Sequence, residues 1–154
     1  MAKIDSIVSY LLRLRDQNYE RGFNFSLTNL KLQKLLYFCE AIFAVSNNKP
    51  LIEDATFQAW KYGPVIPKIY YRYNIFGQNE IPKSSDRDYE ELSQNEKEII
   101  KRVWETLRDK NAFDLVEISH VENGPWYNAY AKGENTIIDF DEILKYYSQN
   151  REDN

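Results

Sequence analysis

The chain has 154 residues, of which 43% are hydrophobic and 29% charged, and its formal net charge is −4 at pH 7. This size and composition fit one globular domain with a core of its own. The longest apolar runs, residues 35–39 and 41–45, are separated by Glu40 and are far shorter than the roughly twenty residues that a membrane span needs. Because Asp5 stands where a signal peptide needs apolar residues, we expect a cytoplasmic protein without a membrane segment.

Cysteine and histidine are too scarce for several kinds of site. The chain has one cysteine, Cys39, and one histidine, His120. One chain can therefore form neither an internal disulfide nor a zinc site of Cys and His ligands. The acidic segment 86–91 lacks the glycine that a calcium loop requires, and the five glycines never cluster around a phosphate. We expect no metal site and no cofactor.

The first third of the chain predicts two helices. Apolar residues recur at intervals of three and four over residues 3–20, and Gly22 follows as a stop signal. A second helix should begin near Thr28, a good N-cap residue, and continue past Phe43 until Asn-Asn-Lys-Pro at 47–50 breaks it. Its apolar positions predict that Leu35 and Leu36 are buried, and Cys39 lies on the same face.

The middle of the chain predicts a short strand followed by a helix. Residues 55–60 alternate between apolar and polar side chains, as a strand does, and Gly63 and Pro64 should end it. Pro67 suits the first turn of a helix that reaches Phe76. Residues 78–91 lack periodicity and predict a loop.

The second half predicts more helices and a second strand. Ser93 and Glu96 have capping-box spacing at the start of a helix that runs to about Lys110 and buries Trp104. Shorter helical segments follow at 112–120 and 126–131, a strand at 136–138 beside the first one, and a last helix after a cap signature at Asp139 and Glu142. These elements predict a mainly α fold with a minor β element (α+β). We expect a single compact helical domain over residues 3–147, with about six to seven helices plus a short strand pair, and a polar C-terminal tail over 148–154.

Charge is unevenly distributed along the chain. Residues 1–79 hold ten Lys and Arg against six Asp and Glu, whereas residues 80–154 hold ten against eighteen. The aromatic segment 55–79 contains no acid and carries Lys61, Lys68 and Arg72. This pattern predicts a weakly basic, aromatic surface on the first half. The pI near 5.1 is far below that of most nucleic-acid binders.

Three segments in a fixed order resemble a known family. They are Thr-Asn-Leu-Lys-Leu-Gln-Lys-Leu-Leu-Tyr-Phe at 28–38, Ala-Trp-Lys-Tyr-Gly-Pro-Val-Ile-Pro at 59–67, and His120 with Gly-Pro-Trp at 124–126. Together they resemble the Panacea domain, also called the SocA-like or GepA-like phage-associated antitoxin domain, over residues 4–147. The resemblance implies a bacterial or phage protein that binds and neutralises a toxin encoded beside it. For one member of the family, neutralisation means delivering the toxin to a protease, so both modes stay open here.

Candidate site residues come from these segments. We interpret Lys31, Lys34, Lys61 and Tyr62 as partner-binding, with the two lysines of the second helix forming a basic edge and lying near the 61–62 turn. Aromatic side chains supply contact area, and lysines steer and orient an acidic partner. A second set is interpreted as structural: Trp60, Gly63, Pro64, Pro67, His120, Pro125 and Trp126. In that set Trp60 should plug the core, and His120 should pack at the corner formed with Trp126.

Two other functions are weighed against an antitoxin. An enzyme that reverses a toxin-made modification would use His120 with Glu117 or Glu122, but no nucleophile–base motif surrounds His120, and we predict no catalytic residue. A nucleic-acid-binding regulator would use the cations of the first half: Lys31, Lys34, Lys61, Lys68 and Arg72. The acidic second half speaks against that regulator. The sequence identifies neither the toxin nor the oligomeric state.

Overall fold

Seven α-helices and a three-stranded antiparallel sheet make up the computed structural model, which describes residues 1–150. The helices are α1 (Ile4–Glu20), α2 (Asn29–Asn47), α3 (Pro67–Tyr73), α4 (Gln94–Leu107), α5 (Ala112–Ser119), α6 (Pro125–Ala131) and α7 (Phe140–Gln149). The strands are β1 (Phe57–Trp60), β2 (Gly63–Val65) and β3 (Thr136–Ile138), and short 3₁₀ turns lie at Asn74–Phe76 and Asp88–Glu91. The predicted mainly α fold with a minor β element is confirmed.

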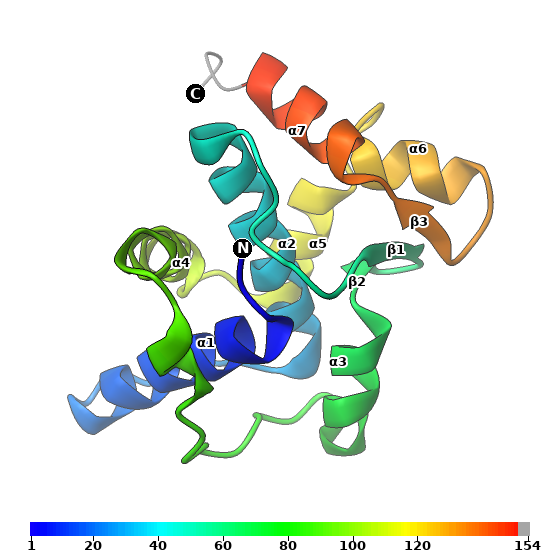
Figure 1. Cartoon of the computed structure of the whole chain (residues 1–154). Coiled ribbons are helices and arrows are strands. Elements are labelled where there is room, and N and C mark those ends of the chain that lie inside the picture. Colours follow the sequence, from blue (N-terminus) through cyan, green and yellow to red (C-terminus); the bar gives the residue numbers. More distant parts are fainter. Residues whose placement is uncertain (151–154) are drawn as a thin grey trace.

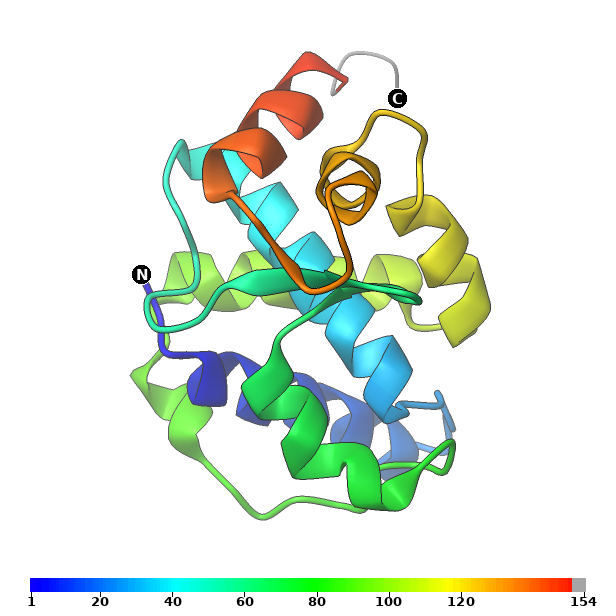
Figure 2. The same cartoon turned by 90° about the vertical axis from the view of Figure 1, so that its right-hand side faces the viewer.

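Helix α2 runs through the middle of the molecule, with the other elements packed around it (Figures 1 and 2). It packs against α3, α4, α5, α7 and β2. Most of its residues are buried, including Leu35 and Leu36, as predicted, together with Cys39. A helix buried around most of its circumference needs apolar residues on most sides rather than along one stripe. Trp104 of α4 is also buried, as predicted.

The predicted helix starts are largely confirmed by their hydrogen bonds. Thr28 is the N-cap of α2, and its hydroxyl accepts a bond from the Lys31 amide. Ser93 and Glu96 form the capping box of α4, each side chain accepting a bond from the other residue's backbone N–H. Asp139 is the N-cap residue of α7, but its side chain makes no capping hydrogen bond.

The sheet has the strand order β2-β1-β3, with β1 and β2 joined by a tight turn. The predicted pairing of 136–138 with the first strand is confirmed, with Phe57 opposite Ile138. The expectation that Gly63 and Pro64 only end the first strand is wrong, because they begin β2 and pair with Trp60 and Ala59. Gly63 has a φ of +106°, a backbone conformation that favours glycine.

Two further expectations need correction. Trp60 is half-buried and does not plug the core, since its ring packs edge-on against that of Tyr70. Helix α7 extends to Gln149, so the beginning of the expected tail is helical, and residues 151–154 lie outside the described residues. None of the helices within residues 1–150 has both the length and the apolarity to cross a bilayer.

Candidate functional site

The turn between β1 and β2 presents the most exposed of the predicted site residues. Tyr62 is 51% exposed and Lys61 is also exposed. The Lys61 ammonium lies 5.4 Å from the centre of the Tyr62 ring, a distance at which the cation and the ring attract. Beside them, the ring of Trp60 meets that of Tyr70 edge-on, with centroids 4.9 Å apart. The turn therefore offers an aromatic and basic surface, as predicted.

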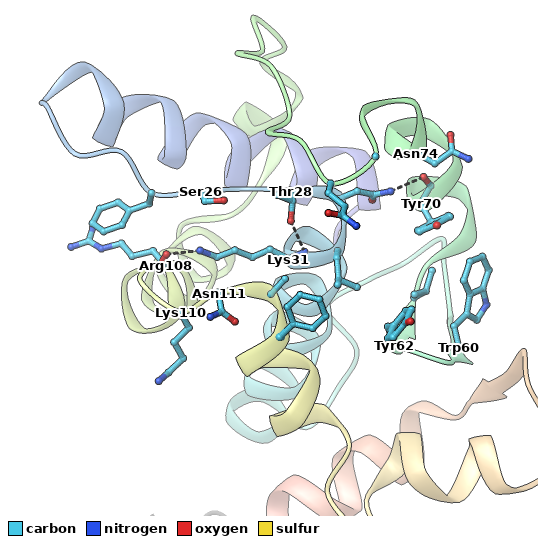
Figure 3. A pocket seen from close by; sticks show the side chains of 18 of the residues that line it. Ser26, Thr28, Lys31, Trp60, Tyr62, Tyr70, Asn74, Arg108, Lys110 and Asn111 are labelled. Carbon is cyan, nitrogen blue, oxygen red and sulfur yellow. Dashed lines mark hydrogen bonds between the residues drawn. The ribbon is translucent and has the colours of Figure 1, made fainter.

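This turn forms one side of a pocket of about 900 Å³, shown in Figure 3. The other sides are the segment before α2, the first turn of α2, the residues between α4 and α5, and the end of α3. Its principal charged and aromatic lining residues are Phe25, Lys31, Trp60, Lys61, Tyr62, Tyr70, Arg108, Asp109, Lys110, Phe113 and Glu134. Segments far apart in the sequence thus meet around one hollow.

Lys31 lies at the inner part of this pocket and not on an exposed helix edge. It is only 2% exposed, and its Nζ donates a 2.5 Å hydrogen bond to the carbonyl oxygen of Arg108, the C-cap residue of α4 (Figure 3). Burial lowers the pKa of Lys31, although the negative charges of Glu80 and Asp109 partly oppose that shift. The predicted solvent-facing position of Lys31 is wrong.

Lys34 is completely buried, which also contradicts its expected place on a basic edge. Its Nζ donates a 2.8 Å hydrogen bond to the carbonyl oxygen of Pro64, and burial lowers its pKa to about 7. A Cβ at Gly63 would lie 2.6 Å from Lys34 Cε and 2.8 Å from Ser119 Oγ, so only glycine leaves room here. The expected proximity of the 31–34 and 61–64 segments is confirmed. Lys34 connects them, however, through a buried hydrogen bond and not as part of an exposed surface.

Two other cations of the predicted basic set, Lys68 and Arg72, both lie close to a carboxylate. Arg72 forms a 2.8 Å ion pair with Asp5, and Lys68 lies 3.9 Å from the same carboxylate. With Lys31 and Lys34 buried, Lys61 is the one member of the five-cation set that is both exposed and outside any ion pair within residues 1–150. These placements argue against a phosphate-backbone surface built from this set.

His120 packs as predicted. Its ring stacks on that of Trp126 with centroids 3.6 Å apart and planes 3° apart. The Trp126 indole N–H donates a 2.7 Å bond to the carbonyl oxygen of Trp60, which ties this corner to the hairpin. Burial, and secondarily the charge of Lys34, lowers the pKa of His120. The hydroxyl of neighbouring Ser119 donates to the carbonyl oxygen of Val116 and is buried, so the pair is not arranged as an accessible nucleophile and base.

The prolines of the motif occupy helix starts. Pro67 and Pro125 stand in the first turns of α3 and α6, where a missing N–H costs no hydrogen bond. Among residues 1–150, no three His, Cys, Asp or Glu side chains gather in a way that could hold a metal ion.

Several pocket residues were not singled out by the sequence. They are Phe25, Arg108, Lys110, Asn111 and Phe113. The Asn111 and Asp114 side chains form a capping box at the start of α5, so the Asn-x-x-Asp spacing could have located this helix start. No local pattern, however, indicates that this helix start faces Tyr62.

Comparisons with known proteins agree with the motifs. The family described as antitoxin SocA-like, Panacea domain, matches residues 32–127, which is more than half of the chain. Antitoxin SocA of Caulobacter vibrioides (strain NA1000 / CB15N) is 35% identical over 127 residues, and the matched region covers 73% of this chain and 64% of that protein. The chain thus spans just under two thirds of this relative's length. No solved structure matches the chain significantly. The chain therefore belongs to the antitoxin SocA-like Panacea domain family.

Proposed function

We propose that this protein is an antitoxin that neutralises a cognate toxin, encoded nearby, by direct protein–protein binding. The observation that carries the proposal is membership of the Panacea family together with the similarity to Antitoxin SocA. The aromatic and basic turn at Lys61 and Tyr62 supports a binding role, because exposed tyrosines act as interface anchors. The buried and hydrogen-bonded placement of Ser119 favours binding over catalysis.

Tyr62 and Lys61 have different expected roles in that contact. Tyr62 supplies a large, rigid contact area, so we expect its loss to speed dissociation of the complex. Lys61 carries the exposed charge, so we expect its loss to slow association at low salt and to weaken the salt dependence. Lys34, being buried, supports the hairpin through its bond to the Pro64 carbonyl oxygen, whereas the buried Lys31 bonds to the carbonyl oxygen of Arg108.

The test begins by co-expressing the chain with the product of each adjacent open reading frame and recovering complexes. Binding kinetics are then measured for wild type, Tyr62→Ala and Lys61→Gln. Tyr127→Ala and Lys132→Gln are matched controls, because both residues are exposed and lie outside the pocket. We expect Tyr62→Ala to raise the dissociation rate about tenfold, a typical effect of losing an anchor, and the controls to leave it unchanged. Equal effects of Tyr62→Ala and Tyr127→Ala would place the contact elsewhere.

The lifetime of the toxin in the cell and the stoichiometry of protection distinguish the possible modes of neutralisation. Direct binding predicts a stoichiometric complex and an unchanged toxin lifetime in the cell. Delivery to a protease predicts a shortened lifetime that lengthens when the protease is removed. An enzyme that reverses the toxin's product predicts protection by substoichiometric antitoxin and its abolition in a folded His120→Gln variant. Retained protection by His120→Gln at a permissive temperature contradicts that enzymatic alternative.

A further inference from the structure

The pocket of Figure 3 has two chemically different ends. Arg108 and Lys110 lie at one end, Trp60, Tyr62 and Tyr70 lie at the other, and Lys31 extends from α2 toward Arg108 (Figure 3). The Arg108 guanidinium lies against the Phe25 ring, and Lys61 lies beside Tyr62. A hollow that contains the buried Lys31 ammonium on one side and the Trp60, Tyr62 and Tyr70 rings on the other matches a ligand that carries an anionic group and a planar ring.

The buried ammonium group of Lys31 is the feature that favours an anionic ligand. It is buried, its one side-chain hydrogen bond within residues 1–150 is to the Arg108 carbonyl oxygen, and it lies 6.0 Å from the centre of the Trp104 ring, although an ammonium has three donors. Among residues 1–150 it forms no ion pair with a carboxylate, although the negative charges of Glu80 and Asp109 act on it. A buried charge without a counter-ion is unfavourable, so an anionic ligand beside it would be stabilised.

Backbone groups reinforce this end of the pocket. The first residues of α2 and of α5, with their N-caps Thr28 and Asn111, both line it. Thr28 and Asn111 accept hydrogen bonds from the Lys31 and Asp114 amides, and the earlier first-turn N–H groups lack partners within the helix and favour negative charge. Asp109 and Glu134 also line the pocket, so the whole lining carries four cations (Lys31, Lys61, Arg108 and Lys110) against two carboxylates.

The aromatic end suits a flat ring. The exposed Tyr62 ring stands beside the Trp60 and Tyr70 pair, and aromatic faces stack on planar bases. The volume of about 900 Å³ lies within the range of known ligand sites, roughly 300–1,000 Å³.

We propose that this pocket binds a mononucleotide, with its phosphates at Lys31 and its base against Tyr62 and Trp60. The proposal goes beyond toxin binding and does not depend on it, because its test contains no toxin.

The test is calorimetric titration of the full chain with ADP, adenosine and pyrophosphate, each in buffer containing EDTA. We expect ADP to bind at least tenfold more tightly than either fragment, because only ADP engages both ends. Equal affinities for ADP and pyrophosphate, or for ADP and adenosine, would overturn the two-ended site, as would the absence of ADP binding at millimolar concentration.

Variants then locate the binding. Tyr62→Ala removes the aromatic end and Lys31→Met removes the buried cation, and each should weaken ADP binding about tenfold, the usual scale for one stacked base or one charged contact. Lys110→Gln tests the cationic end with an exposed residue, so the proposal stays testable if Lys31→Met does not fold. Tyr127→Ala and Lys132→Gln should leave ADP affinity unchanged. Unchanged affinity in Tyr62→Ala and Lys110→Gln would overturn the assignment, whatever the outcome of the toxin experiment.

Discussion

At the scale of single residues, buried polar side chains of α2 connect the central helix to the backbone of surrounding segments. Their hydrogen bonds run from Lys31 to Arg108, from Lys34 to Pro64, between Gln33 and Ile66, and between Glu40 and both Leu51 and Ile52. Buried polar groups persist when they are satisfied in this way. From the sequence, Lys31 and Lys34 are interpreted as partner-binding residues. In the structure Lys34 positions the hairpin and Lys31 the α4–α5 connection, and both segments border the pocket.

The clearest prediction at this scale concerns Gly63. Gly63→Ala places a Cβ 2.6 Å from Lys34 Cε at a φ of +106°, so it combines backbone strain with a steric overlap. Gly22→Ala is a matched control, because Gly22 has a φ of +91° but nothing within 4 Å of its added Cβ. We expect Gly22→Ala to cost about 1 kcal/mol and Gly63→Ala about 1–3 kcal/mol more, measured by urea unfolding. Equal costs for the two variants would mean that the hairpin is not pressed against Lys34.

At the scale of elements, packing against α2 determines the positions of the surrounding helices and of β2. The helix is surrounded, so polar residues placed every few positions do not mark a solvent-facing stripe. The loop that follows the 3₁₀ turn after α3 is held by another set of internal bonds. Arg15 of α1 forms a 2.7 Å pair with Glu80, and Asp16 accepts from the Ser84 amide. A segment without periodicity is thus held in place by tertiary contacts.

The central place of α2 predicts a contrast between two of its apolar residues. Leu35 is fully buried, so Leu35→Ala should leave a cavity and cost about 2–5 kcal/mol of unfolding free energy. Ile42 lies on the same helix but is 38% exposed, and Ile42→Ala should cost less than about 1 kcal/mol. Thermal or urea unfolding of both variants measures the difference. A wild-type-like Leu35→Ala would contradict the observed packing of α2.

At the scale of the whole molecule, buried ionisable groups link folding to pH. Burial raises the pKa of Glu40 to about 7, although its bonds from the Leu51 and Ile52 amides favour the carboxylate. Burial lowers the pKa of Lys34 to about 7. Stability rises with pH wherever the unfolded chain binds more protons than the folded one.

The signs of these two contributions are opposite. Between about pH 4.5 and 7 the folded protein holds a proton on Glu40 that the unfolded chain releases, so the Glu40 contribution to stability falls as pH rises. Between about pH 7 and 10.5 the unfolded chain holds a proton on Lys34 that the folded protein releases, so the Lys34 contribution rises. The lowered pKa of His120 gives a rise with pH that opposes part of the Glu40 contribution.

Two variants separate the Glu40 and Lys34 contributions to the pH dependence of stability. Urea unfolding at pH 5, 7 and 9 should show that Glu40→Gln removes the falling contribution and Lys34→Met the rising one. Each slope has an upper bound of about 1.4 kcal/mol per pH unit for one proton. The measured quantity is the difference between the wild-type and variant free energies of unfolding at each pH, because other groups then cancel. A difference that stays constant with pH would contradict the buried, shifted state of that residue.

The sequence by itself determined the order and type of most elements and the family. Apolar spacing and capping signals depend on residues within one or two turns, so α1, α2 and α4 could be located without knowledge of their neighbours. The packing of His120 with Trp126 was also predictable from the motif. Tertiary structure alone decided the exposure of Lys31 and Lys34, the pairing of β2 with β1, and the pocket that joins Phe25, Tyr62 and Arg108. The physical reason is that exposure and hollows depend on which distant segments pack together, and local spacing does not carry that information.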